Sequence, residues 1–245
     1  MLRNPLIQVD RLWRLICKQL AYLVPEKIPE TLVSLYDGYS RHALDKYYLE
    51  VAKEIVAFCL NGRILDIGCG PGYLAIQVAR LSENTCIDGV DLSLKMVMLA
   101  RNRAIEHGVE KRVKFRVGNA NALDCPEADY DMVVSTGVFQ SLRDPVRFLD
   151  ECFRVLKPAR EAWIYYPAEI TSGAQSLCQG LARDWPKVVV YLGMMLLAKM
   201  FQQGNISEKD LLDIVKRSCF TEYSISVHGD TRLKLKKRDM EAQHG

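Results

Sequence analysis

The sequence has no long hydrophobic run and no marked excess of charge of one sign. Its longest strongly apolar run covers residues 188–198, well short of the roughly 20 residues that a membrane-spanning helix needs. The net charge is only +3 over 245 residues, which is too small to indicate nucleic-acid binding. We therefore expect a protein that neither spans a membrane nor binds nucleic acid.

The sequence also lacks the arrangements of cysteine and histidine that are typical of a metal site. Its eight cysteines occur singly, without a CxxC pair or a cluster with histidine, so neither a zinc site nor a disulfide framework is expected. No signal peptide is evident, because Arg11, Arg14 and Lys18 interrupt the apolar positions near the amino end. These features predict a cytoplasmic protein with reduced thiols and no metal ion.

Strand-like and helix-like patterns alternate from residue 63 onward, which is typical of a parallel sheet with helices on both faces. Asp144 is expected as the N-cap of one helix, with Pro145 at its first position. Two last strands, separated by a Gly-Asp pair, predict a closing antiparallel hairpin. The fold class expected is α/β, with a sheet of seven mostly parallel strands. The expected strands are 63–67, 86–91, 112–117, 131–135, 162–166, 220–228 and 231–236, and the expected helices between them include 71–82, 93–107 and 145–156.

The chain divides into a core and three additions. The core is expected over 41–167 and 206–236, and residues 168–205 interrupt it as a helical insertion. Residues 1–40 carry an amphipathic helix and a lid segment, and the polar tail 237–245 is expected to fray. The amphipathic helix, at 5–23, has three alternative partners: the domain itself, a second copy in a homodimer, and a membrane surface.

A polar and aromatic segment precedes the core. It covers residues 35–41, is broken by Gly38, and leads into a helical pattern at 41–60. Two interpretations of this segment remain open. It is either a plain surface segment or a lid over a bound cofactor that carries Tyr36 and Tyr39.

Residues 63–75 are the stretch around which the chain is organised. A short apolar strand ends there in Gly68, Gly70 and Gly72, and Asp66 stands two residues before the first glycine. Glycines let the backbone turn sharply and let a ligand approach the main chain. A dinucleotide fingerprint requires a third small residue at position 73, but this chain has Tyr73, which we expect to hold the helix off the sheet. The pattern suits S-adenosylmethionine better than a dinucleotide.

A second carboxylate follows at the distance that a ribose-binding acid requires. Asp91 lies 21 residues after Gly70, at the end of the second expected strand, where a carboxylate accepts hydrogen bonds from ribose hydroxyls. Asp88 is the competing choice, but it stands in the middle of that strand. Together the glycine stretch and Asp91 predict a nucleoside-type cofactor site.

Five segments in order resemble the successive motifs of class I S-adenosylmethionine-dependent methyltransferases. The resemblance is to the branch with small-molecule substrates, which includes the ubiquinone/menaquinone methyltransferases, and covers residues 36–167. It implies a Rossmann-like fold with S-adenosylmethionine as the cofactor. The matching segments are 64–72, 90–93, 117–120, 130–135 and 154–158.

The resemblance also implies which residues surround the cofactor: Asp66, Gly68, Cys69, Gly70, Asp91, Leu92, Met96, Asn119, Ala120, Ser135 and Thr136. Asp66 and the two glycines would hold the methionine end, and Asp91 would hold the ribose. Leu92, Met96 and the 119–120 pair would surround the adenine, and the 135–136 pair would line the crevice near the methyl group. The alternative for Cys69 is that it is a small side chain that fills space in the buried core.

Three positions depart from the family pattern. Asn119 stands where relatives usually have aspartate, Gln140 stands where many have histidine, and Lys157-Pro158 is not followed by a double glycine. Asparagine keeps an acceptor oxygen, so cofactor binding is expected to survive. The glutamine argues against a histidine base at that position.

The function expected is in-line methyl transfer to a small, hydrophobic acceptor. Tyr36, Tyr39 and Gln140 are the candidates for orienting that acceptor, and the apolar insertion, with Met194 and Met195, is expected to cap its pocket. A buried helix or a homodimer contact is the alternative for the insertion, and a lipid-like acceptor is left open. A non-catalytic S-adenosylmethionine-binding protein and an NAD(P)-dependent reductase are the alternative functions.

Overall fold

The computed structural model describes residues 26–43, 45–166, 206, 208–228 and 230–239. The expected helix at 5–23, the insertion at 168–205 and most of the tail lie outside the described residues. The elements are α2 Val33–Ala43, α3 Asp45–Phe58, β1 Gly62–Ile67, α4 Tyr73–Leu81, β2 Thr85–Asp91, α5 Leu94–Glu106, β3 Val113–Val117, β4 Tyr130–Thr136, η2 Phe139–Ser141, α6 Pro145–Val155, β5 Leu156–Tyr166, α9 Glu208–Arg217, β6 Glu222–His228 and β7 Asp230–Lys236.

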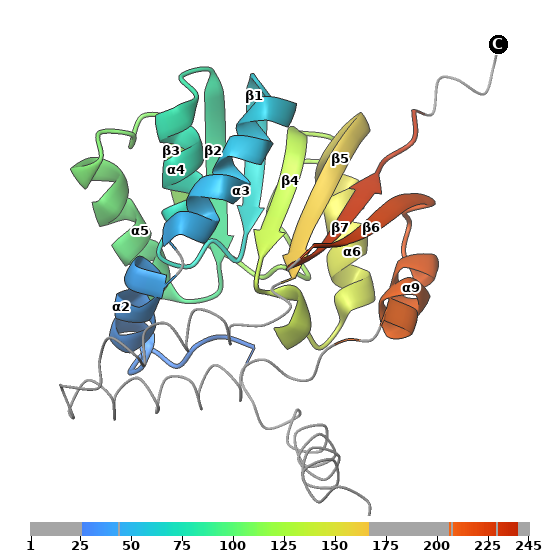
Figure 1. Ribbon diagram of the computed structural model, residues 1–245, viewed down its shortest axis with the longest axis horizontal. Coiled ribbons are helices and arrows are strands. Elements are labelled where there is room, and N and C mark those ends of the chain that lie inside the picture. Colours follow the sequence, from blue (N-terminus) through green and yellow to red (C-terminus); the bar gives the residue numbers. More distant parts are fainter. Residues whose placement is uncertain (1–25, 44, 167–205, 207, 229, 240–245) are drawn as a thin grey trace, which may run out of the picture.

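The strands form one sheet in the order β3-β2-β1-β4-β5-β7-β6. The first five are parallel, and β7 runs antiparallel to both of its neighbours, β5 and β6 (Figure 1). The seven-stranded, mostly parallel sheet with a closing hairpin is therefore confirmed. Strand order reverses at β1, which lies between β2 and β4, and such a reversal leaves a crevice at the carboxyl ends of the strands.

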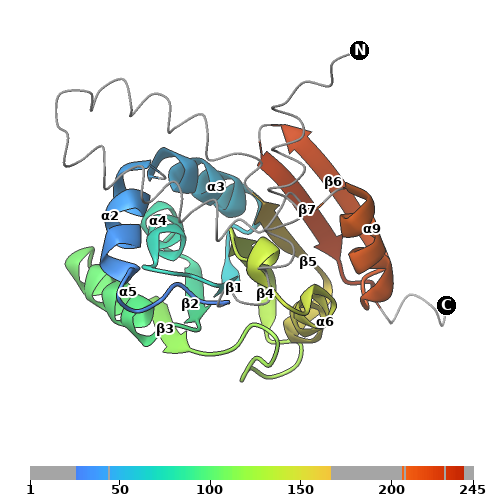
Figure 2. The same ribbon diagram turned by 90° about the horizontal axis from the view of Figure 1, so that it is seen from below.

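Helices cover both faces of the sheet, and β1 contributes side chains to each face. Ile64 packs with residues of α3, α4 and α5, whereas Leu65 and Ile67 pack with residues of α6 and α9. Figure 2 shows these two layers of helices on opposite sides of the strands. All three β1 side chains are fully buried, as expected for a central parallel strand.

Local capping fixes where two of the helices begin. The Asp144 side chain accepts from the backbone amide of Arg147 at 3.1 Å, with Pro145 in the first turn of α6, which confirms the cap predicted from the sequence. Ser93 does the same for α5 by accepting from the amide of Met96 at 3.3 Å. Each cap satisfies a helix amide that has no partner within the helix.

The structure corrects two predicted boundaries. Residues 35–41 are helical, because α2 runs through Gly38 as Val33–Ala43, and the single helix expected at 41–60 is instead the pair α2 and α3. β5 begins at Leu156 rather than at 162. There Lys157 forms an ion pair with Asp131 of β4 at 2.9 Å, which holds the chain beside β4 well before the expected start.

Among the described residues, no helix is long and apolar enough to cross a membrane.

Candidate functional site

The glycine turn after β1 combines three left-handed backbone positions. Gly68, Gly70 and Gly72 have φ values of +73°, +51° and +82°, a region that side-chain-bearing residues adopt only under strain. A Cβ at Gly68 would lie 2.0 Å from Val138, and one at Gly72 would lie 2.9 Å from Ala100. Gly72 therefore allows close packing of helices α4 and α5.

Gly70 differs from its neighbours because a Cβ there would meet nothing within 4 Å. Packing therefore does not explain the glycine, although its φ of +51° does. The open space in front of Gly70 belongs to a cavity at the carboxyl ends of the central strands. A ligand can approach the main chain directly at this point.

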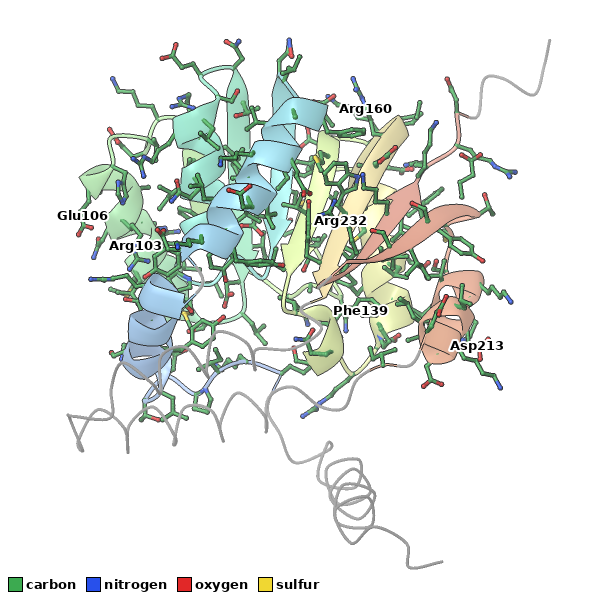
Figure 3. The ribbon with its side chains drawn as sticks, viewed as in Figure 1. Arg103, Glu106, Phe139, Arg160, Asp213 and Arg232 are labelled. Atoms are coloured by element: carbon green, nitrogen blue, oxygen red, sulfur yellow. The ribbon has the colours of Figure 1, made fainter. Side chains whose placement is uncertain are left out.

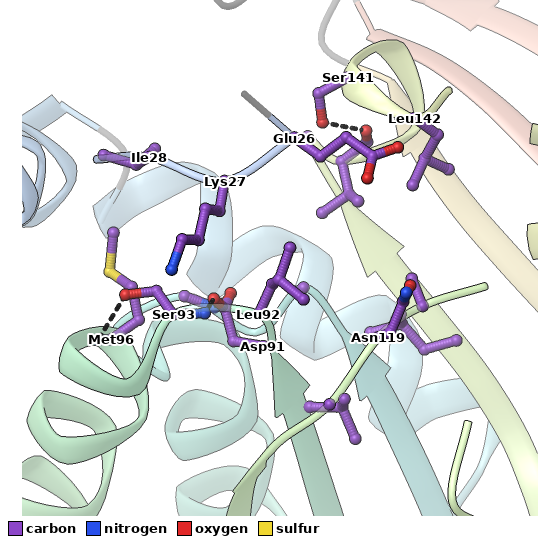
Figure 4. A pocket seen from close by; sticks show the side chains of 18 of the residues that line it. Glu26, Lys27, Ile28, Asp91, Leu92, Ser93, Met96, Asn119, Ser141 and Leu142 are labelled. Atoms are coloured by element: carbon purple, nitrogen blue, oxygen red, sulfur yellow. Dashed lines mark hydrogen bonds between the residues drawn. The ribbon is translucent and has the colours of Figure 1, made fainter. Parts of the chain in front are cut away.

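The cavity opens where strand order reverses, as the topology requires. It is lined by residues from the glycine turn, from the ends of β2 and β4, from the loops that follow β3 and β4, and from the amino-terminal segment (Figure 4). Tyr36 lines it, together with eight of the predicted cofactor residues: Gly68, Gly70, Asp91, Leu92, Met96, Asn119, Ala120 and Thr136.

Asp91 joins the glycine turn to the end of β2. One carboxylate oxygen accepts from the amide of Gly70 at 2.9 Å, and the other accepts from the amide of Ser93 at 2.8 Å. Burial raises the pKa of Asp91, while these backbone amides lower it. Each oxygen keeps further acceptor capacity toward the cavity, which suits a ligand with hydroxyl donors.

Asp66 is a buried acid without a hydrogen-bond partner in the described part of the chain. Asp66 is 1% exposed, and neither of its carboxylate oxygens accepts a hydrogen bond from a described residue. Burial, and to a lesser extent the nearby charge of Asp91, raises the pKa of Asp66 to about 7. A buried polar group without a partner is costly, so this acid is suited to a ligand that supplies a cation or a donor.

The three candidates for orienting an acceptor are not all brought together. Tyr36 lines the cavity, and burial raises the pKa of its hydroxyl, so it remains a neutral donor. Gln140 lies in η2 beside the cavity rather than in its lining, with Oε1 buried and no partner among the described residues. Tyr39 belongs to α2, but its side chain lies outside the described part.

Two predicted cofactor residues, Ser135 and Cys69, have side chains that face away from the cavity. Ser135 is fully buried, and its hydroxyl donates to the carbonyl of Ile67 at 2.8 Å. This corrects the expectation that Ser135 lines the crevice, because the hydroxyl faces the neighbouring strand. The Cys69 side chain packs in the core against Gly89, as the alternative of a buried filler predicts, and burial raises its pKa.

Tyr73 contacts helices α2 and α3, which its sequence pattern does not predict. Its hydroxyl donates to Asp37 of α2 at 2.9 Å, and its ring stacks on Tyr48 of α3 at 6.0 Å. The ring thus turns toward α2 and α3, and the close packing occurs at Gly72. The expectation that Tyr73 holds the helix off the sheet is wrong.

The amino-terminal segment 26–30, which we call the strap, crosses the mouth of the cavity. Glu26 accepts from the amide of Arg143 at 2.8 Å on one side, and Glu30 accepts from the hydroxyl of Ser93 at 2.9 Å on the other. Figure 4 shows the side chain of Lys27 pointing from the strap toward Ser93. The sequence predicts a lid within 1–40 but does not single out Glu26 or Glu30, because their contacts join positions far apart in the chain.

Comparison with known proteins gives one match to a family model and many similar relatives. The model described as "Methyltransferase domain" matches residues 64–159. Ajmaline N-methyltransferase of Rauvolfia serpentina is 34% identical over 92 residues, which cover 38% of this chain and 31% of that protein. The ubiquinone/menaquinone biosynthesis C-methyltransferase of Geotalea daltonii is 28% identical over 140 residues, which cover 54% of this chain and 60% of that protein.

The likeness among solved structures extends over most of the chain. A crystal structure of a candidate S-adenosyl-L-methionine-dependent methyltransferase from Methanococcus maripaludis covers 89% of this chain and 98% of its own, with a TM-score of 0.71 and 20% identity. At this identity the likeness concerns the fold. The chain spans less than two thirds of the length of the two curated relatives described above.

Proposed function

We propose that this chain, whose residues 64–159 match the model of a methyltransferase domain, transfers the methyl group of S-adenosylmethionine to a small-molecule acceptor. The observation that carries the proposal is the pair of carboxylates beside the glycine turn. Asp66 has both oxygens buried without a partner in the described region, and Asp91 lines the cavity at the end of β2.

The residues present fit S-adenosylmethionine on their own chemistry. The cofactor carries an ammonium group at its methionine end. This group would give the Asp66 carboxylate a positively charged partner and hydrogen-bond donors. Its ribose hydroxyls would find acceptor capacity at Asp91. Leu92 and Met96 would offer an apolar wall to the adenine, and the open face of Gly70 would admit the cofactor close to the backbone.

The cofactor supplies a methyl group on a positively charged sulfur, which is already a strong electrophile. The work left to this chain is to align the acceptor and exclude water. Tyr36 is the described candidate for aligning it, because the residue lines the cavity and burial keeps its hydroxyl neutral by raising its pKa. The strap contributes to excluding water, since Glu26 and Glu30 fasten it on both sides of the cavity mouth.

A reductase that uses NAD(P) is disfavoured by the same turn. In a dinucleotide site, backbone amides of the glycine turn face a pyrophosphate. Here the amide of Gly70 donates to Asp91, so a dianion placed there would lose that donor and meet a carboxylate. A non-catalytic cofactor-binding protein stays the second candidate, supported by Asn119 and Gln140, which depart from the family pattern that the sequence resembles.

For the acceptor we propose a hydrophobic small molecule. Its support is the apolar run 188–198, which contains Met194 and Met195 and is followed by Met200, because methionine-rich surfaces adapt to varied apolar shapes. The two relatives named above are an N-methyltransferase and a C-methyltransferase, so the acceptor atom is left open. We also propose, as further alternatives, a lipid-like acceptor, contact with a membrane surface and a homodimer.

Calorimetric titration tests the proposal directly. Purified protein is titrated with S-adenosylmethionine, S-adenosylhomocysteine and NADH, and we expect the first two to bind and the third not to bind. Labelled methyl transfer is then measured with a panel of quinols, phenols and apolar amines. Binding without transfer to any of them would favour the non-catalytic alternative, and binding of NADH alone would overturn the proposal.

A further inference from the structure

Three helices meet behind the glycine turn at a buried polar cluster, which we call the latch: Asp37 of α2, Tyr73 of α4 and Arg103 of α5. Nη2 of Arg103 donates to both oxygens of Asp37, at 2.9 and 3.1 Å. The hydroxyl of Tyr73 donates to Asp37 at 2.9 Å. Figure 3 shows Arg103 where α5 approaches α2.

Arg103 also reaches the glycine turn itself. Its Nη1 donates to the carbonyl of Pro71 at 2.5 Å, and Pro71 stands between Gly70 and Gly72. The guanidinium lies 4.2 Å from the centre of the Tyr73 ring, at cation–π distance. One side chain thus holds the turn, the start of α4 and helix α2, which we call the lid helix because its Tyr36 lines the cavity.

The latch is buried on both sides of its ion pair. Arg103 and Asp37 are each 7% exposed, and a pair taken out of water in this way is weak evidence for stability, because its desolvation offsets its attraction. The planar, five-donor fork of arginine is instead suited to fixing several partners in one geometry. Its partners here are the parts of the chain that enclose the cavity.

Asp37 is adjacent in the chain to Tyr36, which lines the cavity. Gly70, on the other side of Pro71 from Gly72, opens onto the same cavity. A change in the position of Arg103 would therefore shift the lid and the glycine turn relative to each other. Tyr36 and Gly70 would then no longer face a bound ligand together.

We propose that Arg103 is a positioning residue that couples the lid helix α2 to the glycine turn, so that cofactor binding depends on an ion pair that does not touch the cofactor. The inference rests on the proposed function for the identity of the ligand. The latch itself rests only on contacts within this chain.

The test compares Arg103→Met and Arg103→Lys with a control, Arg63→Met. Arg63 also pairs with a buried acid, Asp88, at 2.7 Å, but it stands at the opposite end of β1 from the cavity. S-adenosylhomocysteine affinity is measured by calorimetry, and amide hydrogen exchange of residues 33–43 is measured without ligand. Both measurements are made under conditions in which circular dichroism shows that each variant is fully folded.

We expect Arg103→Met to weaken S-adenosylhomocysteine binding about tenfold, within the range usual for coupling between two elements, and to speed amide exchange in α2. Arg103→Lys keeps the charge but cannot hold Pro71 and Asp37 together, so it should restore only part of the affinity. Arg63→Met should leave both measurements within twofold of the unmodified protein. Should Arg103→Met fail to fold, Tyr73→Phe removes one bond to Asp37 and should weaken binding by a smaller factor.

Two results would overturn the proposal: unchanged affinity with unchanged exchange in the Arg103 variants, or an equal loss in Arg63→Met. If Arg103→Met does not fold, unchanged affinity in Tyr73→Phe overturns it. A failure of the proposed function looks different. In that case the unmodified protein does not bind S-adenosylhomocysteine, while the exchange of α2 still reports whether Arg103 holds the lid.

Discussion

The backbone amide of Gly70 donates to the carboxylate of Asp91 across 2.9 Å. This bond ties the turn after β1 to the end of β2, two segments that are adjacent in the sheet but 21 residues apart in the chain. It consumes the donor that an anion would need, and it orients an acid toward the cavity. Cofactor choice therefore depends on this pair more than on the glycines alone.

Asp91→Asn tests that relationship. An amide has one acceptor oxygen, so it can accept from Gly70 or from Ser93 but not serve both as the carboxylate does. We expect at least a tenfold loss of S-adenosylmethionine affinity by calorimetry and about 1–3 kcal/mol lower stability. Asp124→Asn, at an exposed position, is the matched control and should change neither quantity. Full affinity in Asp91→Asn would contradict the role of the acid.

Gly70→Ala separates backbone strain from ligand contact. Gly70 and Gly108 both have left-handed φ values, +51° and +67°, and both face open space. Alanine at either site should lower the free energy of unfolding by roughly 1–2 kcal/mol. Only Gly70→Ala should also weaken cofactor binding, because its methyl group enters the cavity. Equal binding by the two variants would show that the open space at Gly70 is not the ligand site.

Asp66 predicts a pH dependence of stability. Burial raises its pKa from 3.8 to about 7, so between these values the folded state binds a proton that the unfolded state releases. The contribution of Asp66 is complete below about pH 4 and is lost as the pH rises to about 7. The free energy of unfolding of Asp66→Asn should therefore rise relative to that of the unmodified protein by roughly 1.4 kcal/mol per pH unit over this window. Denaturation curves at four pH values measure the difference, and a constant difference contradicts it.

Cofactor binding should have the opposite pH dependence at the same residue. An ionised carboxylate attracts an ammonium group and a protonated one does not. We expect S-adenosylmethionine affinity to rise between pH 6 and pH 8 and then level off, with Asp66→Asn weak and flat over that range. Calorimetry in buffers of different ionisation enthalpy would show the accompanying proton release.

Tyr36→Phe tests the acceptor side of the cavity. The variant loses the hydroxyl of a residue that lines the cavity while keeping the ring. We expect the transfer rate to fall roughly tenfold or more with S-adenosylmethionine affinity within twofold. Tyr223→Phe, at a residue 40% exposed in β6, is the control. A loss of cofactor affinity equal to the loss of rate would place Tyr36 in cofactor binding instead.

Deletion of residues 178–202 tests the proposed acceptor cap. We expect methyl transfer to be abolished while S-adenosylhomocysteine still binds, since the described residues that line the cavity, such as Gly70 and Asp91, belong to other parts of the chain. Calorimetry and labelled transfer on the same preparation provide the two measurements. Loss of folding or of cofactor binding would instead favour a buried helix or a dimer contact for this segment.

Much of the fold followed from local pattern. Periodicity located each described strand, and residue chemistry located the cap at Asp144, because capping depends on a few adjacent residues. The boundaries of α2 and β5 did not follow. A buried contact of Asp37 accompanies the helix through Gly38, and the ion pair of Lys157 with Asp131 accompanies the early start of β5. Local propensity is too weak to predict such tertiary effects.

The sequence by itself determined the sheet, the glycine turn and the acid at Asp91, because each depends on spacing within a strand–helix unit. Only the tertiary structure decided that Ser135 faces β1, that the strap crosses the cavity and that Arg103 joins three helices. The bond between Glu26 and Arg143 joins residues 117 positions apart. Such contacts arise when packing brings distant segments together, so no local pattern encodes them.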